Sequence, residues 1–196
     1  MKTFILVLIF IIGVFYYYVP NDTKVELFEK VGLDSSIFVS SGSIDNVEVK
    51  GGLIDVKFDS SNKSTYKGNI SAGEVMTDLS WAQLQYVKCF TKDESVNFNG
   101  NVVLHKVWLP KNKTLLVKMI KDSPELNLSI YVYKTSLNNE LPPNVKFVYD
   151  CLKDFSINET KTIDMKGNTA PSEVIIGVSG ANGALDGGYS LELEQK

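Results

Sequence analysis

The chain has 196 residues and a formal net charge of −3. Its length predicts one main domain, and its charge provides no electrostatic basis for binding nucleic acid. All 20 basic residues are lysine, and arginine is absent. Because the planar guanidinium group is best suited to bidentate recognition of phosphate and guanine, this composition argues against a nucleotide or nucleic-acid site.

The first 20 residues, MKTFILVLIFIIGVFYYYVP, place Lys2 before an uncharged stretch from Thr3 to Val19. This pattern is typical of an export signal. The stretch ends in bulky residues without a small-x-small cleavage site, and its three tyrosines stand where an interfacial aromatic belt would lie. We therefore expect an uncleaved, single-pass membrane anchor with everything after Pro20 periplasmic or extracellular. A cleaved signal peptide, which would give a secreted protein, is the alternative.

Residues 21–75 are polar with short apolar runs and are interpreted as an N-terminal extension. Alternation around Gly51 and Gly52 predicts a β-hairpin. Its apolar positions are Val47 and Val49 before the turn and Ile54, Val56 and Phe58 after it. The following stretch, SSNKSTYKGN, is predicted to be a loop.

Residues 76–196 are interpreted as the main domain. Seven short runs rich in Val, Ile, Tyr and Leu follow one another here, separated by Pro, Asn, Gly or Asp. They are VVLHKVWLP, TLLVKMIKD, LNLSIYVYK, VKFVYDC, TKTIDMKG, EVIIGVSG and GYSLELEQ. Strands at such close spacing, without a convincing long helix, predict an all-β antiparallel sandwich or barrel.

The run LNLSIYVYK alternates in character. Leu126, Leu128, Ile130 and Val132 share one face, which we expect to pack on Ile175 or Val178 and on Leu191 or Leu193. Asn127, Ser129, Tyr131 and Tyr133 share the other face. These tyrosines either pack against further structure or form a binding surface. With Trp81 and Trp108 they are the candidate stacking platforms for a carbohydrate.

Two cysteines, Cys89 and Cys151, lie in the part of the chain expected outside the cytoplasm. An even pair in an exported chain predicts a disulfide, and two free thiols are the alternative. Closing a loop of this length would stabilise the protein by about 4 kcal/mol in the chain-entropy model.

No residue is assigned a catalytic role. His105 lies in the middle of a predicted strand between Val103 and Val107, which predicts a packed or hydrogen-bonded residue. The carboxylates Asp45, Asp55, Asp59, Asp78 and Asp150 have no spacing that singles out a catalytic pair.

The glycine-rich run GVSGANGALDGGYS lacks the Lys-Ser/Thr of a phosphate-binding loop. It is interpreted as a hairpin loop that needs positive φ angles. A calcium site there would draw on Asp186 and Asn182, but with one carboxylate it would be weak. No metal and no cofactor are therefore predicted.

The strand LNLSIYVYK and the closing stretch EVIIGVSGANGALDGGYSLELE resemble the bacterial pre-peptidase C-terminal domain. The pieces DLSWA, CF, FNGNVV, LP and DC, in this order, resemble an exported and mostly uncharacterised branch of that group. The resemblance covers about Met76 to Lys196. It implies a jelly-roll-like β-sandwich, usually without catalytic residues, and it supports pairing Cys89 with Cys151. The Asp common in the first of these strands is Asn127 or absent, which weakens the case for calcium.

We therefore expect a non-catalytic interaction or accessory module at the cell envelope, with an envelope protein or a polysaccharide as its partner. A carbohydrate-binding module that uses the four aromatic residues named above is the alternative. A hydrolase that uses unassigned carboxylates is the alternative from another class.

Overall fold

The computed structural model describes residues 53–83, 88–135 and 141–196. The chain divides into two units after Asp45, and every described residue belongs to the second unit. The predicted anchor, residues 1–20, and the first strand of the predicted hairpin lie outside the described residues. In the described ranges, no helix is long and apolar enough to cross a membrane.

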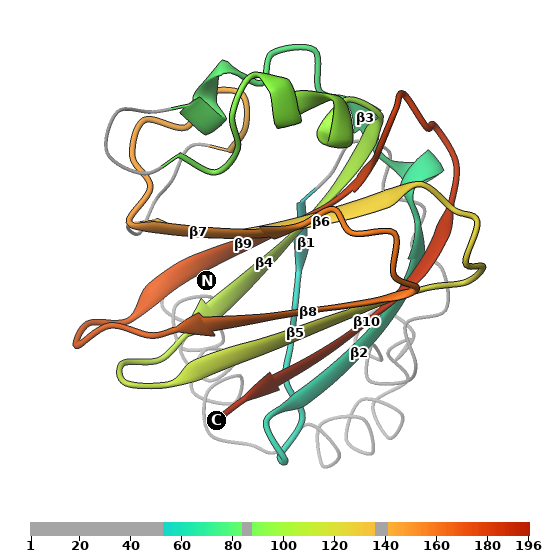
Figure 1. Cartoon of the computed structure of the whole chain (residues 1–196). Helices are drawn as coiled ribbons and strands as arrows, with labels where there is room; N and C mark the ends of the chain where they lie inside the picture. The colour runs from blue at the N-terminus through green and yellow to red at the C-terminus, as the bar shows by residue number, and fades with distance from the viewer. Residues whose placement is uncertain (1–52, 84–87, 136–140) are drawn as a thin grey trace, which may run out of the picture. The chain divides into compact units, whose positions relative to one another are not determined.

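Two sheets pack face to face as a sandwich (Figure 1). Sheet A has the order β1 (Leu53–Asp55), β4 (Asn101–Leu109), β9 (Ser172–Gly180), β6 (Leu128–Thr135) and β7 (Asp150–Asp154), and β3 (Glu74–Val75) pairs with β4. Sheet B has the order β2 (Lys63–Asn69), β10 (Gly188–Gln195), β5 (Thr114–Lys121) and β8 (Thr160–Lys166). The predicted β-sandwich is confirmed. Its pairing is antiparallel except between β1 and β4, which are parallel.

Six of the seven predicted strands are present, and one prediction is wrong. The run VKFVYDC contributes little to a strand, because β7 begins only at Asp150. The predicted loop SSNKSTYKGN instead contains β2. This strand was missed because it lies at the edge of sheet B, where Lys63, Thr65 and Lys67 face solvent and Tyr66 alone brings a large apolar surface to the core.

The structure also differs from the domain boundary predicted between residues 75 and 76. The strands β1, β2 and β3 lie upstream of that boundary, yet they pair with β4 or β10 in the two sheets. The sandwich therefore already includes Leu53.

The core between the sheets is built by alternation along each strand. Leu128 and Ile130 are buried there in one cluster with Leu191 and Leu193, and Ile130 pairs directly with Val178. The predicted inward face of β6 is therefore confirmed.

Strand β6 is buried on both faces. Its outward residues Tyr131 and Tyr133 form a second apolar cluster with Ile175 of β9. This outer face of sheet A is covered by residues 76–83 and 88–98, which we call the covering segment and which contain the short 3-10 helices η3 (Ser80–Gln83) and η4 (Asp93–Phe98). Figure 1 shows the covering segment on the side of sheet A opposite to sheet B.

Aromatic rings make the contact between the covering segment and the sheet. The Trp81 ring centroid lies 5.6 Å from that of Tyr131 and 5.3 Å from that of Tyr133. Phe98 meets the Tyr131 ring edge-on at 5.8 Å. Tyr131 lies flat on the sheet because its neighbour is Gly177, where a Cβ atom would be 2.1 Å from the Tyr131 Cζ.

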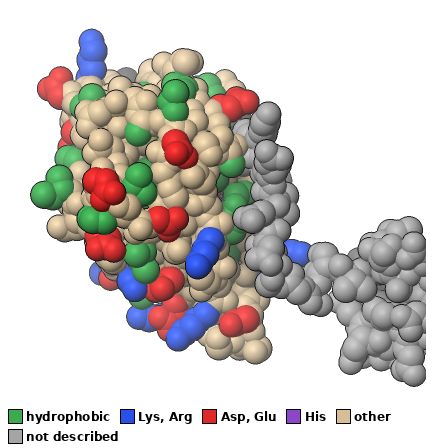
Figure 2. Space-filling model, turned by 90° about the vertical axis from the view of Figure 1, so that its right-hand side faces the viewer, with side chains coloured by type: hydrophobic (Ala, Val, Ile, Leu, Met, Phe, Trp, Pro, Cys, Tyr) green, Lys and Arg blue, Asp and Glu red, His purple; other side chains and the backbone are tan. Residues whose placement is uncertain are grey.

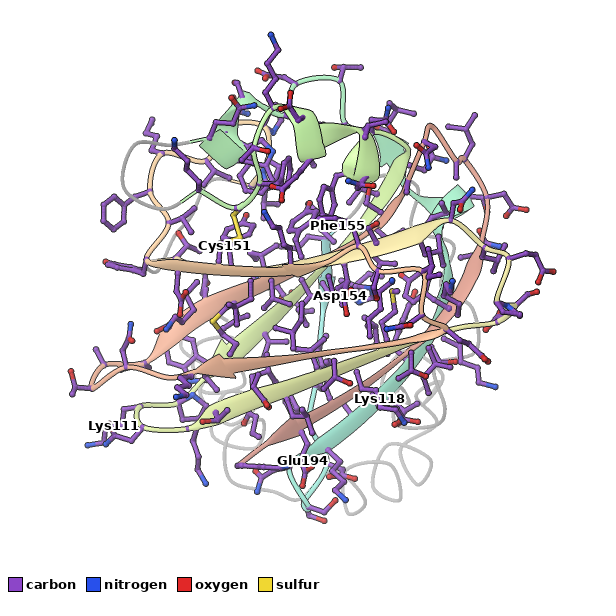
Figure 3. All side chains as sticks on the ribbon, in the orientation of Figure 1. Lys111, Lys118, Cys151, Asp154, Phe155 and Glu194 are labelled. Atoms are coloured by element: carbon purple, nitrogen blue, oxygen red, sulfur yellow. A yellow bond between two sulfur atoms is a disulfide. The ribbon has the colours of Figure 1, made fainter. Side chains whose placement is uncertain are left out.

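The disulfide between Cys89 and Cys151 is confirmed, with a Cα–Cα distance of 5.1 Å. It joins the covering segment to β7, the edge strand of sheet A (Figure 3). The bond therefore holds an otherwise irregular segment on the apolar face of a sheet.

Substitutions on the two faces of β6 should test this three-layer arrangement. We expect Ile130→Ala and Tyr131→Ala each to lower the free energy of unfolding by about 2–5 kcal/mol, because both side chains are buried. Tyr131→Phe should change it by less than about 1 kcal/mol, since the buried hydroxyl has no hydrogen-bond partner among the described residues. Urea denaturation measures all three. If Tyr131→Ala lowered the free energy of unfolding as little as the exposed Ile157→Ala, this would contradict burial of Tyr131 under the covering segment.

Loss of the disulfide should loosen the covering segment. We expect the double variant Cys89→Ser/Cys151→Ser to be less stable by about 2–4 kcal/mol in urea denaturation. Fluorescence of Trp81, measured in a Trp108→Phe background, should shift to longer wavelength as the indole is exposed to water. An unchanged Trp81 spectrum together with unchanged stability would show that the bond does not hold the cover.

Candidate functional site

Three connectors meet at one end of the sandwich, on the right in Figure 1. They are residues 122–127 between β5 and β6, 155–159 between β7 and β8, and 181–187 between β9 and β10. A groove of about 210 Å³ lies among them, and its lining includes Leu126, Phe155, Ile157 and Asn182. We call this groove, with its rim, the connector groove.

The buried side chain of Lys121 joins two of these connectors through hydrogen bonds. Its Nζ donates to the carbonyl oxygens of Pro124 at 2.9 Å, Leu126 at 3.1 Å and Ile157 at 3.0 Å. An ammonium group has three donors, so these three acceptors satisfy it although the residue is only 3% exposed. The connectors are therefore held in place before any ligand arrives.

Lys161 of β8 supports the same connector from a second point. Its Nζ donates to the carbonyl oxygen of Ser156 and lies 3.9 Å from Asp154 Oδ1. Burial lowers the pKa of Lys161, and the nearby Lys121 lowers it further, whereas Asp154 raises it. Both lysines thus act as internal braces and present no ammonium group to solvent at the groove.

Apolar side chains surround the connector groove and are exposed. Ile157 is 92% exposed, and Phe155, Val96 and Leu185 are also exposed. Phe155 points from the end of β7 toward the covering segment, on the opposite side of the strand from Asp154 (Figure 3), and meets Phe98 edge-on. The Asn182 N–H donates to the Val96 carbonyl oxygen at 2.8 Å, which joins η4 to the third connector. Exposed apolar side chains that gather in this way mark an interaction site.

The rim of the groove is acidic. The connectors carry Asp122, Glu125, Glu159 and Asp186, all exposed, and contain no lysine. Figure 2, which views this end, shows acidic side chains among hydrophobic ones, with lysines mainly in the lower part. A hydrogen bond from Ser123 lowers the pKa of Glu125, so this carboxyl is ionised at neutral pH. The end therefore combines apolar side chains with negative charge.

The tyrosines of β6 follow the packing alternative, and the alternative of an exposed aromatic surface with Trp81 is not formed. Trp81, Tyr131 and Tyr133 are buried between the covering segment and sheet A, so none of them can stack on a ligand in this structure. Trp108 is half exposed on β4, and its role as a stacking platform stays a prediction. The groove residues Phe155 and Ile157 were missed, although the apolar pair in DFSINE between two strands is a weak signal of an exposed apolar turn.

His105 is a packed strand residue, as predicted. Its Nε2 lies 2.9 Å from the Tyr189 hydroxyl, and its ring meets Tyr66 edge-on at 4.7 Å. Burial lowers the pKa of His105 to about 3, so the imidazole is neutral at physiological pH.

The glycine-rich run connects strands of different sheets. Asn182 and Gly183 have φ angles of 54° and 74°, which confirms the predicted need for positive φ. The predicted hairpin is wrong, because β9 belongs to sheet A and β10 to sheet B. Asp186 and Asn182 lie on this connector, and the described part of the chain has no group of three or more His, Cys, Asp or Glu residues placed to hold a metal ion.

No protein-family model matches the chain, and no curated protein matches it. Several solved structures are similar. A pre-peptidase C-terminal domain is among them. This domain, of a collagenase from Bacillus anthracis, has 10% identity and a TM-score of 0.38 over 74% of this chain and 96% of that chain.

Two other similar structures are a lysozyme inhibitor and a copper-binding protein. The periplasmic inhibitor of g-type lysozyme, PliG, from Aeromonas hydrophila has 11% identity and a TM-score of 0.43 over 75% of this chain and 98% of that chain. CorA, a surface-associated copper-binding protein of Methylomicrobium album BG8, has 9% identity and a TM-score of 0.41 over 75% of this chain and 98% of that chain.

His105 should make the protein sensitive to acid. The unfolded state binds a proton at this residue below about pH 6.5, whereas the folded state binds one only near pH 3. The free energy of unfolding should therefore fall as the pH drops from about 6.5 toward 3, by up to about 1.4 kcal/mol per pH unit. In urea denaturation across this range, His105→Gln should show a smaller slope than wild type. Equal slopes would contradict a neutral, buried His105.

Proposed function

We propose that the protein is a non-catalytic extracytoplasmic interaction module that binds a basic, apolar segment of a partner protein in the connector groove. The observation that carries the proposal is the joint presence of exposed apolar side chains and exposed acidic side chains on three braced connectors. The disulfide fits a protein that works in an oxidising compartment outside the cytoplasm.

The negative charge of the groove connectors favours a basic partner segment. Asp122, Glu125, Glu159 and Asp186 are exposed on the connectors that form the groove. Lys121, which lines the groove, and Lys161 are buried, and carbonyl oxygens accept hydrogen bonds from both ammonium groups. A segment with lysine or arginine would meet opposite charge at the rim, and its apolar side chains would cover Phe155 and Ile157. An acidic segment would be repelled.

The rigidity of the groove connectors favours a binding role over a catalytic role. The groove connectors are fixed by Lys121 and by the bond from Asn182 to Val96, so a partner would not have to order them. His105 is buried in the core in the middle of β4 and does not line the groove.

A peptide pair can test the proposal. We expect a labelled peptide of alternating lysine and leucine to bind the protein in fluorescence anisotropy, with affinity that falls as salt is added. A peptide of alternating glutamate and leucine should not bind. Glu125→Lys/Glu159→Lys should weaken binding of the lysine peptide by about tenfold or more at low salt, and Ile157→Ser should weaken it as well.

The matched control is Asp164→Lys/Glu173→Lys, which changes the net charge equally but lies on β8 and β9, outside the groove lining. It should retain most of the affinity. Equal weakening by the two double variants would show that the peptide follows overall charge and would refute the groove as the site.

A further inference from the structure

A second hollow, of about 660 Å³, lies at the opposite end of the sandwich. It is formed where β6 ends at Thr135, by residues 110–113 between β4 and β5 and by residues 167–171 between β8 and β9. Its polar lining comes from Asn112, Thr135, Asn168, Thr169 and Ser172, and one wall is Tyr149. The volume is within the range of pockets that bind small ligands.

Among the described residues, the lining contains amides and hydroxyls but no charged side chain, and the exposed Lys111 and Lys113 flank Asn112 on its connector. A metal ion would find no carboxylate in this lining. The hollow is therefore suited to a neutral ligand with many hydroxyl groups.

The polar groups are held in place from behind. Lys134, which is almost fully buried, donates from Nζ to Asn168 Oδ1 at 3.2 Å and to the Lys166 carbonyl oxygen at 2.6 Å. The same Nζ lies 3.3 Å from Asp150 Oδ2. Because Asn168 Oδ1 is engaged by Lys134, the amide orientation is fixed and Nδ2 remains as a donor.

Other groups in the lining of the hollow can form further hydrogen bonds. Asn112 donates its backbone N–H to the Asn168 carbonyl oxygen at 2.8 Å, which joins the two connectors. Ser172 is only 5% exposed and lines the hollow. A hydroxyl in this position can bond to water or to a ligand.

An exposed aromatic pair lies at the rim. Tyr149 and Phe147 are 49% and 46% exposed, and their rings meet edge-on at 4.8 Å. Both are fixed to β6, since the Tyr149 N–H donates to the Lys134 carbonyl oxygen at 2.9 Å and the Thr135 hydroxyl donates to the Phe147 carbonyl oxygen at 3.0 Å.

We infer that this hollow binds a neutral saccharide. A pyranose ring has an apolar C–H face and hydroxyl groups at its edge. Tyr149 provides a flat surface for that face, and Asn112, Asn168 and Ser172 provide donors and acceptors for the hydroxyls. The inference rests on residues separate from the connector groove and does not depend on the proposed function.

Affinity electrophoresis tests the inference with a panel of neutral polysaccharides: soluble starch, laminarin, xyloglucan, galactomannan and arabinan. We expect at least one of these gels to retard the wild-type chain. Tyr149→Ala should lower the apparent affinity for that polysaccharide by about tenfold or more, because a stacking ring is lost. Asn168→Ala should lower it as well. Thermal unfolding checks that each variant remains folded.

Ile157→Ser is the matched control, since it changes an exposed residue at the other end of the sandwich and should leave retardation unchanged. If Tyr149→Ala unfolds, Tyr149→Leu replaces it, because leucine keeps apolar contacts but gives no flat ring. Failure of every gel to retard the wild-type protein overturns the inference. So does retardation that Tyr149→Ala or its replacement leaves unchanged.

Discussion

Sheet A is apolar on both faces, and the rest of the structure follows from covering both of them. One face is covered by sheet B in the usual way of a sandwich. The other face carries Tyr131, Tyr133 and Ile175, which would form a large apolar surface if left open. The covering segment closes it with Trp81, Phe90 and Phe98, and the disulfide supplies the anchoring that 3-10 turns alone would not. Stability of the middle layer thus depends on a segment with little regular structure of its own.

This constraint decides where a ligand can bind. Much of the outer face of sheet A is already occupied, so the connectors at the two ends of the sandwich are the surfaces best placed to vary without disturbing the core. Each end is braced by a buried lysine. Lys121 donates to backbone carbonyl oxygens of two connectors at one end. Lys134 donates to the Lys166 carbonyl oxygen at the end of β8 and to Asn168 Oδ1 on the connector at the other end. The chemistry of the ends differs: the connectors at one end carry exposed acidic and apolar side chains, and the hollow at the other end is lined by amides and hydroxyls.

The sequence allowed most of the sandwich to be predicted because period-two alternation is strong wherever one strand face meets the core. Strand β2 was not predicted, because its inward positions are Ser64, Tyr66 and Gly68 and this pattern resembles that of a loop. The tyrosines of β6 were harder to place, since tyrosine suits both an exposed platform and a buried layer, and the alternation of LNLSIYVYK is the same in either case. The position of the covering segment decides between the two, and the sequence of that segment has no periodicity. The grooves at the ends depend on which connectors meet in space, and local pattern carries no information about that.

The burial of the brace lysines affects how a partner could be captured chemically. The three connectors around the groove contain no lysine, and Lys121 and Lys161 at their bases are sealed from solvent. Reagents that couple one amine to another would therefore find no attachment point on those connectors. A carbodiimide, which joins a carboxylate directly to an amine, has four exposed carboxylates there to activate. Covalent trapping at this end of the molecule thus requires zero-length coupling between an acid on the module and a base on whatever docks against it.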